Sequence, residues 1–256
     1  MKLTVLGCWA PYPKAGGACS GYLIQEAGLN ILLEAGNGSL SRLMGIIDFR
    51  LLDAVVVTHL HHDHYADLFV FRYAIEGARR DGSRDGPLKL FVPGEPAGEY
   101  NLLAGFDKAF TTVPIESLPR EPLDKDYEVC RLNMGGLDFR FAPIKHPVPG
   151  YSVSISGPGK LVFSSDTART SIIAALARNA SLFLCEASGQ DSDAEVMKEI
   201  HLTAGQAGEL AREAGVKRLL LTHFWPEYDP AVLGEQAEKT FKRPVELARE
   251  GETYLV

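Results

Sequence analysis

The stretch AVVVTHLHHDHYADL, residues 54–68, places four histidines and one aspartate within six positions of a chain that contains only seven histidines. These side chains follow directly after Val55-Val56-Val57, which is too short and too rich in β-branched residues for a helix and therefore predicts a buried strand. Packing alone rarely gathers imidazoles at such a place. We interpret the stretch as a metal-binding loop that begins where a strand ends.

The same pattern recurs at three other apolar segments, each of which runs into a side chain that can bind a metal. These segments are residues 141–144 before His146, residues 161–163 before Asp166, and residues 219–221 before His223. Strand ends in a packed sheet are rigid, so side chains that leave them can converge on one point with little conformational entropy left to lose. The sequence therefore predicts a single site built from several strand ends.

The spacing of the loop is H-x-H-x-D-H. In an extended turn, His59 and His61 can share one ion, while Asp63 and His64 face a second ion nearby. His62 is the odd residue of the set, and we expect it to point to solvent or to contact a ligand side chain. Imidazoles combined with a few carboxylates suit Zn²⁺, and also Mn²⁺ or Fe²⁺.

The composition is ordinary for a soluble globular protein. Of the 256 residues, 46% are hydrophobic and 23% are charged, and neither a linker nor a repeat divides the chain, so we expect one domain over residues 1–256. No apolar run reaches the roughly 20 residues that a membrane span requires. The opening segment MKLTVLGCWAPYP predicts a strand and a turn rather than a signal peptide.

The cysteines and the net charge narrow the class further. The four cysteines (Cys8, Cys19, Cys130 and Cys185) form no C-x-x-C pair and indicate free thiols in a reducing cytoplasm. The net charge of −7 offers no general attraction toward a polyanion such as nucleic acid. We therefore expect a cytoplasmic protein with no membrane association.

Periodicity predicts strands that alternate with single helices, an arrangement typical of layered sheets covered by helices. The predicted strands are residues 22–26, 30–34, 55–58, 88–94, 130–134, 137–146, 150–156, 160–166, 182–187 and 219–221. The predicted helices are a short one within 36–47 and longer ones at 66–78, 101–110, 170–178 and 204–214. The last helix is the best defined, because Thr203 and Gln206 have the spacing of a capping box and Gly215 stops it.

The motifs GNG, THLHHDH, SSDT, CEAS and HLTAGQAGELAREAGVKRLLLTHF, with a lone His146 between the second and third, resemble the metallo-β-lactamase superfamily. Within it, they resemble the branch that contains ribonuclease Z and small phosphodiesterases. The resemblance covers nearly the whole chain. It implies an α/β fold, an αββα four-layer sandwich of two mixed β-sheets flanked by helices, with the active site along one edge.

The resemblance also implies a dinuclear metal-dependent hydrolase that attacks its substrate with a metal-bridging hydroxide. It assigns His59, His61 and His146 to one divalent ion and Asp63, His64 and His223 to the other, with Asp166 bridging both. Zn²⁺ is the first expectation for the two ions, with Mn²⁺ and Fe²⁺ as alternatives. Asp63 would also orient the nucleophile and accept its proton.

His201 is not needed to complete either ligand set. In ribonuclease Z-like phosphodiesterases, a histidine that matches this H-x-T-A position contacts the scissile phosphate and helps to protonate the departing oxygen. The alternative is that His201 only packs at the entrance of the helix that follows.

The length of one connection bears on the substrate. Ribonuclease Z carries a long tRNA-binding arm between the lone histidine and the bridging aspartate, whereas Asp166 follows His146 by only twenty residues here. Small phosphodiesters such as cyclic nucleotides are therefore expected rather than tRNA precursors, although an arm within residues 79–110 stays open. Similar proteins are commonly dimers, so a homodimer is an open expectation.

Several alternatives remain at this point. A lactonase or another carboxyl-ester hydrolase would use the same centre, as would a tRNA-processing endoribonuclease. A redox di-iron protein of this fold would usually have a glutamate in the loop and an attached flavin domain, and neither is seen. An inactive metal-binding module is the fourth alternative.

Three weaker hypotheses concern the surroundings of the site. The amides of Gly36 and Gly38 can approach a phosphate, or these glycines only turn the chain. Phe224, Trp225 and Tyr228 follow His223 closely, and they either stack on a nucleobase or pack together. The turn GGACSGY, residues 16–22, is a candidate border of the site.

Overall fold

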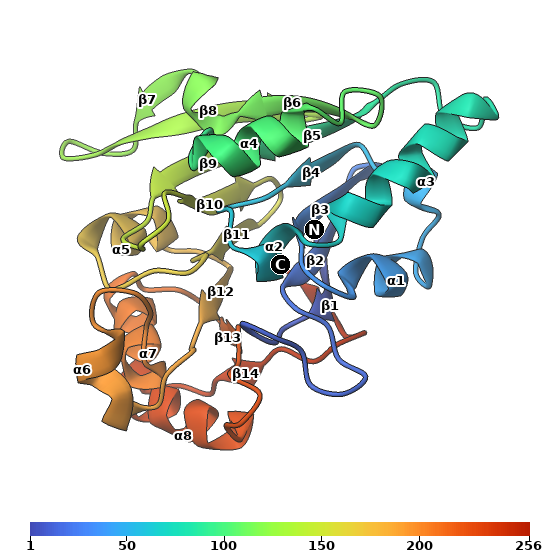
Figure 1. The fold of residues 1–256 in the computed structure, drawn as a ribbon. Helices are drawn as coiled ribbons and strands as arrows, with labels where there is room; N and C mark the ends of the chain where they lie inside the picture. Colours follow the sequence, from blue (N-terminus) through green and yellow to red (C-terminus); the bar gives the residue numbers. More distant parts are fainter.

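The computed structural model describes all residues from 1 to 256 and shows two β-sheets packed face to face, with helices on both outer faces (Figure 1). One sheet has seven strands in the order β15-β1-β2-β3-β4-β5-β6, and the other has eight in the order β14-β13-β12-β11-β10-β9-β8-β7. Both sheets contain parallel and antiparallel pairs. The predicted αββα sandwich of the α/β class is confirmed.

The strands of the first sheet are β1 (Lys2–Gly7), β2 (Gly21–Glu26), β3 (Leu29–Ala35), β4 (Ala54–Val56), β5 (Leu88–Val92), β6 (Phe110–Pro114) and β15 (Thr253–Leu255). Those of the second sheet are β7 (Arg120–Pro122), β8 (Glu128–Met134), β9 (Leu137–Pro143), β10 (Tyr151–Ser156), β11 (Lys160–Phe163), β12 (Leu182–Glu186), β13 (Leu219–Thr222) and β14 (Glu246–Leu247).

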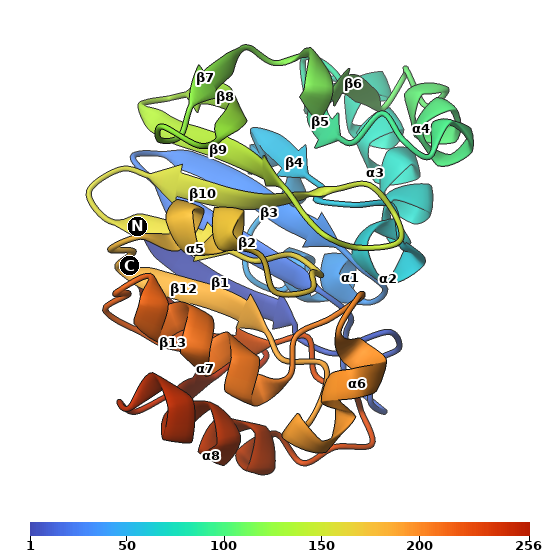
Figure 2. The ribbon, with the colours of Figure 1, turned by 90° about the vertical axis from the view of Figure 1, so that its left-hand side faces the viewer.

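The helices that pack on the first sheet are α1 (Ser39–Met44), α3 (Leu68–Arg80) and α4 (Ala97–Ala104), and those on the second are α5 (Ser171–Ala177), α7 (Ala204–Glu213) and α8 (Pro230–Phe241). Figure 2 shows α5, α7 and α8 on one side of the stacked strands and α1 and α3 on the other. Two short helices, α2 (His62–Tyr65) and α6 (Ala194–Met197), belong to loops. No helix in the structure has the length and apolar character that crossing a membrane requires.

Strands β1 to β4 of the first sheet are buried on both faces over most of their length, which explains their largely apolar sequences. Alternate side chains point in opposite directions, so Tyr22 and Ile24 of β2 enter the core between the sheets while Leu23 packs beneath the outer helices. In β4, Val56 faces the inner core and Val55 the outer one.

The register of the sheets gathers the candidate ligands at one edge. β3, β4 and β5 are parallel, as are β11, β12 and β13, so the carboxyl ends of the strands within each set lie together. The two sheets also meet there, because the amide of Tyr151 donates to the carbonyl of Thr58 at 2.9 Å. A bridge between His59 and Gly150 closes the same edge.

Several predicted boundaries need correction. Residues 62–65 are a helical turn rather than an extended loop, since the amides of His64 and Ala66 donate to the carbonyls of His61 and His62. The segment predicted as a helix over 101–110 contains only the end of α4: the helix stops at Gly105, and Phe110 begins β6, which pairs with β5. Strands β4, β9 and β11 each end three residues before their ligand rather than at it.

Other elements were not predicted. They are α6, α8, β6, β7, β14 and β15, whereas β1 confirms the strand predicted in the opening segment. The capping box at Thr203 and Gln206 is confirmed, as is the end of α7 at Gly215, where φ is +63°. The four cysteines are free and buried, also as predicted.

The packing of α7 against α8 gives a first prediction. A Cβ added to Gly208 in α7 would overlap the carbonyl of Ala237 and the hydroxyl of Thr240 in α8, whereas one added to Gly77 in α3 would meet no atom within 4 Å. Gly208→Ala should lower the free energy of unfolding by about 1–3 kcal/mol. Gly77→Ala, the matched control, should raise it by about 0.5–1 kcal/mol. Urea denaturation measures both, and similar values for the two variants would contradict this helix packing.

Candidate metal centre

Seven of the side chains singled out in the sequence lie together at the edge where the sheets meet. They form two groups, His59, His61, His146 and Asp166 in one and Asp63, His64 and His223 in the other, and within each group one ligand atom per residue lies within 4.8 Å of the others. The residues come from four separate loops, those that follow β4, β9, β11 and β13. Their convergence is the central expectation of the sequence reasoning, and the structure brings all seven together.

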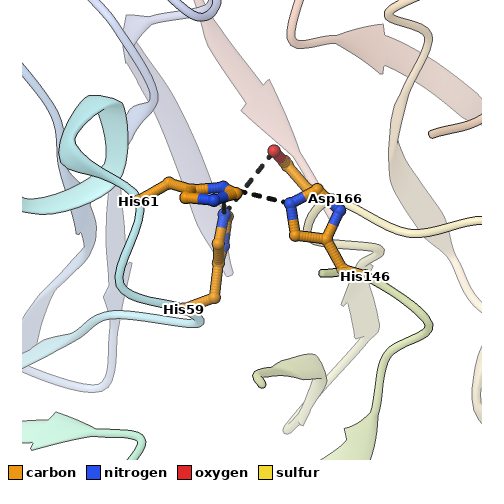
Figure 3. Close-up of side chains that lie close together, drawn as sticks. All are labelled: His59, His61, His146 and Asp166. Atoms are coloured by element: carbon orange, nitrogen blue, oxygen red, sulfur yellow. Dashed lines mark hydrogen bonds and ion pairs between the residues drawn. The ribbon is translucent and has the colours of Figure 1, made fainter. Parts of the chain in front are cut away.

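The first group consists of three imidazoles and one carboxylate that point toward one another (Figure 3). The Nε2 atom of His59 lies 3.2 Å from Nδ1 of His61, which lies 3.0 Å from Nε2 of His146. Oδ2 of Asp166 lies 3.6 Å from Nε2 of His59. His59 is fully buried, while His61 and His146 are half-buried.

The second group is arranged in the same way around a different point. The Nε2 atoms of His64 and His223 face each other at 3.2 Å. Oδ1 of Asp166 lies 3.4 Å from the first and 3.1 Å from the second, and Oδ2 of Asp63 lies 3.6 Å and 3.5 Å from them. Asp166 therefore presents one oxygen to each group.

These contacts fit bound cations better than a hydrogen-bond network. Ring nitrogens that face each other at about 3 Å place two lone pairs, or two N–H groups, head to head unless a proton or a metal lies between them. Oδ1 of Asp166 is buried without a hydrogen bond, an expensive state for a polar atom. The nitrogen and oxygen donors suit Zn²⁺, Mn²⁺ or Fe²⁺.

The electrostatics of the two groups differ. Burial lowers the pKa of His59 well below its usual value, and it also lowers the pKa values of His61 and His146. These imidazoles are therefore neutral at pH 7, which is the form that binds a metal.

In the second group, the pKa values of the histidines are raised rather than lowered. Burial alone would lower the pKa of His223, but the carboxylates of Asp166 and Asp63 raise it to about 10. The pKa of His64 is raised well above its usual value in the same way. Although burial opposes it, the neighbouring histidines hold the pKa of Asp166 well below its usual value. The buried carboxylates thus favour positive charge at this point, and divalent cations would supply it.

Two of the imidazoles are oriented by groups that the sequence reasoning did not select. Glu34 is fully buried at the end of β3, where Oε1 accepts from the amide of Thr58 at 3.0 Å and Oε2 lies 3.4 Å from Nδ1 of His64. His146 is held through its Nδ1–H, which donates to the carbonyl of Ile200 at 2.7 Å. Such contacts fix which nitrogen faces a metal.

Glu186 at the end of β12 orients two further imidazoles. The hydroxyl of Ser188 donates to Oε2 of Glu186 at 2.5 Å and accepts from Nδ1–H of His223 at 2.8 Å. Both oxygens of Glu186 lie 3.1 Å from Nδ1 of His201. Glu186 belongs to the motif CEAS, but the sequence did not predict that Glu186 or Glu34 orients an imidazole. No local spacing links these two residues to the histidines.

His201 lies beside both groups without belonging to either. Its side chain is 20% exposed, and one of its ring nitrogens lies within 4.8 Å of ligand atoms on Asp166 and His223. Burial would lower its pKa, but Glu186 raises it above the usual value. The structure thus holds a sixth histidine side chain at the edge of the centre, with one nitrogen hydrogen-bonded to a buried carboxylate.

Three residues around the centre have left-handed backbone conformations, which residues other than glycine rarely adopt. Glu34, Ser165 and His223 have φ values of +62°, +56° and +61°. Each lies within one residue of a strand end or of a candidate ligand, or is itself one. Strain of this kind costs about 1–3 kcal/mol per residue and persists where the surrounding structure enforces it.

The hypothesis that the amides of Gly36 and Gly38 bind a phosphate is wrong. The amide of Gly38 donates to Asp67 and that of Gly36 donates to the carbonyl of Ser20, so neither is free for a phosphate. Gly36 instead allows a close approach, because a Cβ there would overlap the backbone carbonyl of Asp63. It lets the histidine loop lie against the turn after β3.

The remaining histidine and the aromatic residues have different roles. His62 is exposed, as expected for the odd residue of the loop, and its ring stacks on Tyr65 with 5.5 Å between centroids. Phe224 is buried in the core, whereas Trp225 lines the cavity beside the ligand groups. Tyr228 donates its hydroxyl hydrogen to Asp193 at 2.9 Å. The turn over residues 16–22 does not line this cavity.

Fold and site together define a metal-dependent hydrolase of the metallo-β-lactamase fold. The family model described as "Beta-lactamase superfamily domain" matches residues 29–224, and the chain belongs to that superfamily. The chain is 29% identical to the probable metallo-hydrolase YhfI of Bacillus subtilis over 98% of both chains. The crystal structure of YhfI superposes with a TM-score of 0.89 at 27% identity, covering 99% of this chain and 98% of that one.

A relative named ribonuclease Z supports the ribonuclease Z-like branch, and a second solved structure shares the fold. A ribonuclease Z of Myxococcus xanthus is 25% identical and covers 99% of this chain and 97% of its own length. Unliganded yeast PDE1 shares the fold with a TM-score of 0.72 at 14% identity, covering 100% of this chain and 99% of that one. The similarity extends over essentially the whole chain in each case.

Metal analysis tests the ligand set. We expect the purified protein to carry up to two divalent ions per chain, and chelation to lower its thermal midpoint, because the facing imidazoles and buried carboxylates then lose their compensating charge. Asp166→Ala should reduce the metal content of both groups, whereas His62→Ala should leave it unchanged. Elemental analysis of the two variants decides this, and full metal content in Asp166→Ala would remove Asp166 from the set.

Proposed function

We propose that the chain hydrolyses small phosphodiesters, such as cyclic nucleotides, with two divalent ions held by the seven residues of the two groups. The observation that carries the proposal is His201, an imidazole that lies beside Asp166 and His223 while Glu186 holds its Nδ1. A hydrolase that expels an alkoxide benefits from such a group, since the departing oxygen needs a proton. The relative named ribonuclease Z belongs to a class that cleaves phosphodiesters, which supports this choice over carboxyl esters.

When bound, divalent ions at such a centre lower the pKa of a coordinated water and neutralise negative charge on phosphoryl oxygens. The protein side chains would then manage the protons. Asp63, only about one-tenth exposed, has a carboxylate that borders the cavity and would orient the attacking water and accept its proton. His201 would donate the proton on Nε2 to the leaving oxygen, while Glu186 fixes the ring through Nδ1.

The shape of the site supports a small substrate. The cavity that contains Asp63, Asp166, His201 and His223 has a volume of about 490 Å³. The residues between His146 and Asp166 form β10, β11 and their turns, and residues 79–110 form the end of α3, β5 and α4. Both segments where a tRNA-binding arm was considered are thus part of the sandwich, and we propose a small molecule rather than tRNA as the partner.

A substrate panel tests the proposal. After reconstitution with Zn²⁺, Mn²⁺ or Fe²⁺, kcat/KM is measured for a cyclic nucleotide, bis-p-nitrophenyl phosphate, an acyl-lactone and a tRNA precursor. We expect the two small phosphodiesters to rank first under every metal that gives activity. A higher kcat/KM for the lactone would reassign the centre to ester hydrolysis, and one for the tRNA precursor would make the chain a processing endoribonuclease.

The role of His201 is tested by truncation. His201→Ala should reduce kcat by about 10²–10⁴-fold, because the leaving oxygen loses its proton donor, while metal content stays intact. Tyr73→Ala serves as the control, since its ring is 60% exposed on α3 and lies outside the cavity. Equal turnover in His201→Ala and in the unmodified protein would exclude proton donation, and a loss of metal would instead make His201 a ligand.

A further inference from the structure

One part of the cavity has no role in the proposed hydrolysis of the phosphodiester bond. Beyond the metal-binding side chains and their neighbours, the lining consists of Pro11, Val196, Met197, Ile200 and Trp225, together with the small Ala10. We call these five larger residues the apolar wall. No lysine or arginine lines the cavity.

The apolar wall is more exposed than core packing would require. Val196 is 75% exposed and Trp225 is 37% exposed, although both are large and hydrophobic. Single exposed apolar residues are common on protein surfaces, but here they gather around one cavity that already contains the candidate centre. An apolar surface beside a few convergent polar groups is the usual composition of a small-molecule site.

The indole of Trp225 is held in place from two sides. Its ring meets Tyr12 edge to face, with centroids 6.4 Å apart, and lies 6.4 Å from the ring of Tyr228. The hydroxyl of Tyr12 in turn donates to Glu227 at 3.0 Å. A fixed aromatic ring at the mouth of a cavity can stack on a ligand with little loss of side-chain entropy.

The two sides of the apolar wall are also connected. Tyr228 donates its hydroxyl hydrogen to Asp193, which closes the capping box just before α6, and α6 carries Val196 and Met197. This hydrogen bond links the loop that carries Trp225 and Tyr228 to the segment that leads into α6.

We propose that the apolar wall binds a flat aromatic ring carried by the phosphodiester, and that this ring stacks on Trp225. The inference rests on the proposed function and narrows it to substrates with a nucleobase or a similar ring. Because neither lysine nor arginine lines the cavity, a second phosphate on the substrate would find no guanidinium or ammonium group to pair with. The site therefore selects substrates whose only anionic group is the scissile diester.

A matched pair of substrates tests the inference. Adenosine 3′,5′-cyclic phosphate and methyl ribofuranoside 3′,5′-cyclic phosphate share the sugar and the scissile bond, and only the first carries a base. We expect the unmodified protein to prefer the first by about 10- to 100-fold in kcat/KM, as base stacking on an aromatic side chain provides. Trp225→Ala should abolish most of this preference by raising KM for the nucleotide alone, and Trp225→Phe should retain most of it.

Tyr73→Ala is the control for loss of an exposed aromatic side chain, since Tyr73 is 60% exposed on α3 and lies outside the cavity. It should keep the preference unchanged. Equal kcat/KM values for the two substrates, or an undiminished preference in Trp225→Ala, would overturn the inference while leaving phosphodiester hydrolysis intact.

If neither substrate is hydrolysed under any metal, the proposed function fails, and binding then tests the apolar wall by itself. The chain has two tryptophans, so the Trp9→Phe variant leaves Trp225 as the only indole. Titration with the same two compounds should quench its fluorescence with the nucleotide and not with the base-free sugar. Quenching by neither compound, or by both equally, would reject the stacking site.

Discussion

The buried carboxylate of Asp166 lies between two groups of imidazoles, and the organisation of the whole edge follows from that placement. Its side chain is almost completely buried, with one oxygen toward His59 and the other toward His64 and His223. A charged group in such a place costs several kcal/mol unless positive charge compensates it. The sandwich supplies the compensation by ending β4 and β13 at the same edge as β11, so that residues far apart in the chain share one small volume.

The precision of the site comes from contacts behind the ligands. Glu34, the Ser188–Glu186 pair and the carbonyl of Ile200 each occupy the ring nitrogen that faces away from the centre. The left-handed backbone of Glu34 and His223 shows that the fold bears local strain to aim these side chains. A ring fixed at one nitrogen has its other nitrogen oriented before any ion arrives, so binding loses little further entropy.

The convergence of the seven candidate ligands could be predicted from the sequence because their chemistry and their spacing are local facts. The spacing H-x-H-x-D-H and the apolar runs before His146, Asp166 and His223 need no knowledge of the fold. Several of the predicted strands, among them β4, β12 and β13, are buried on both faces, which gives continuous apolar runs. By contrast, β14 and β15 are short and sit at sheet edges, and only their pairing with β13 and β1 defines them.

The sequence did not predict the role of Glu34, because this role depends on strand pairing that local spacing does not reveal. Glu34 ends a strand as many charged residues do, and only the parallel pairing of β3 with β4 brings it beside Thr58 and His64. The helical turn over 62–65 was overlooked because a row of ligands suggested an extended loop. His61 is the N-cap residue of this helical turn and is also a candidate ligand. The start of the turn therefore also fixes where the His61 side chain begins.

The segment between β12 and α7 links substrate selection to the centre. It begins with Glu186, which orients His201, and it passes through α6 with Val196 and Met197. It ends with the carbonyl of Ile200, which accepts from His146. This one short connection carries three of the five residues of the apolar wall, the proposed proton donor and the hydrogen-bond partner of His146. A displacement of α6 would therefore change the positions of side chains at the centre. Relatives of this fold that accept other substrates would therefore be expected to differ first in this connection and in the residue at Trp225, while the strand ends stay the same.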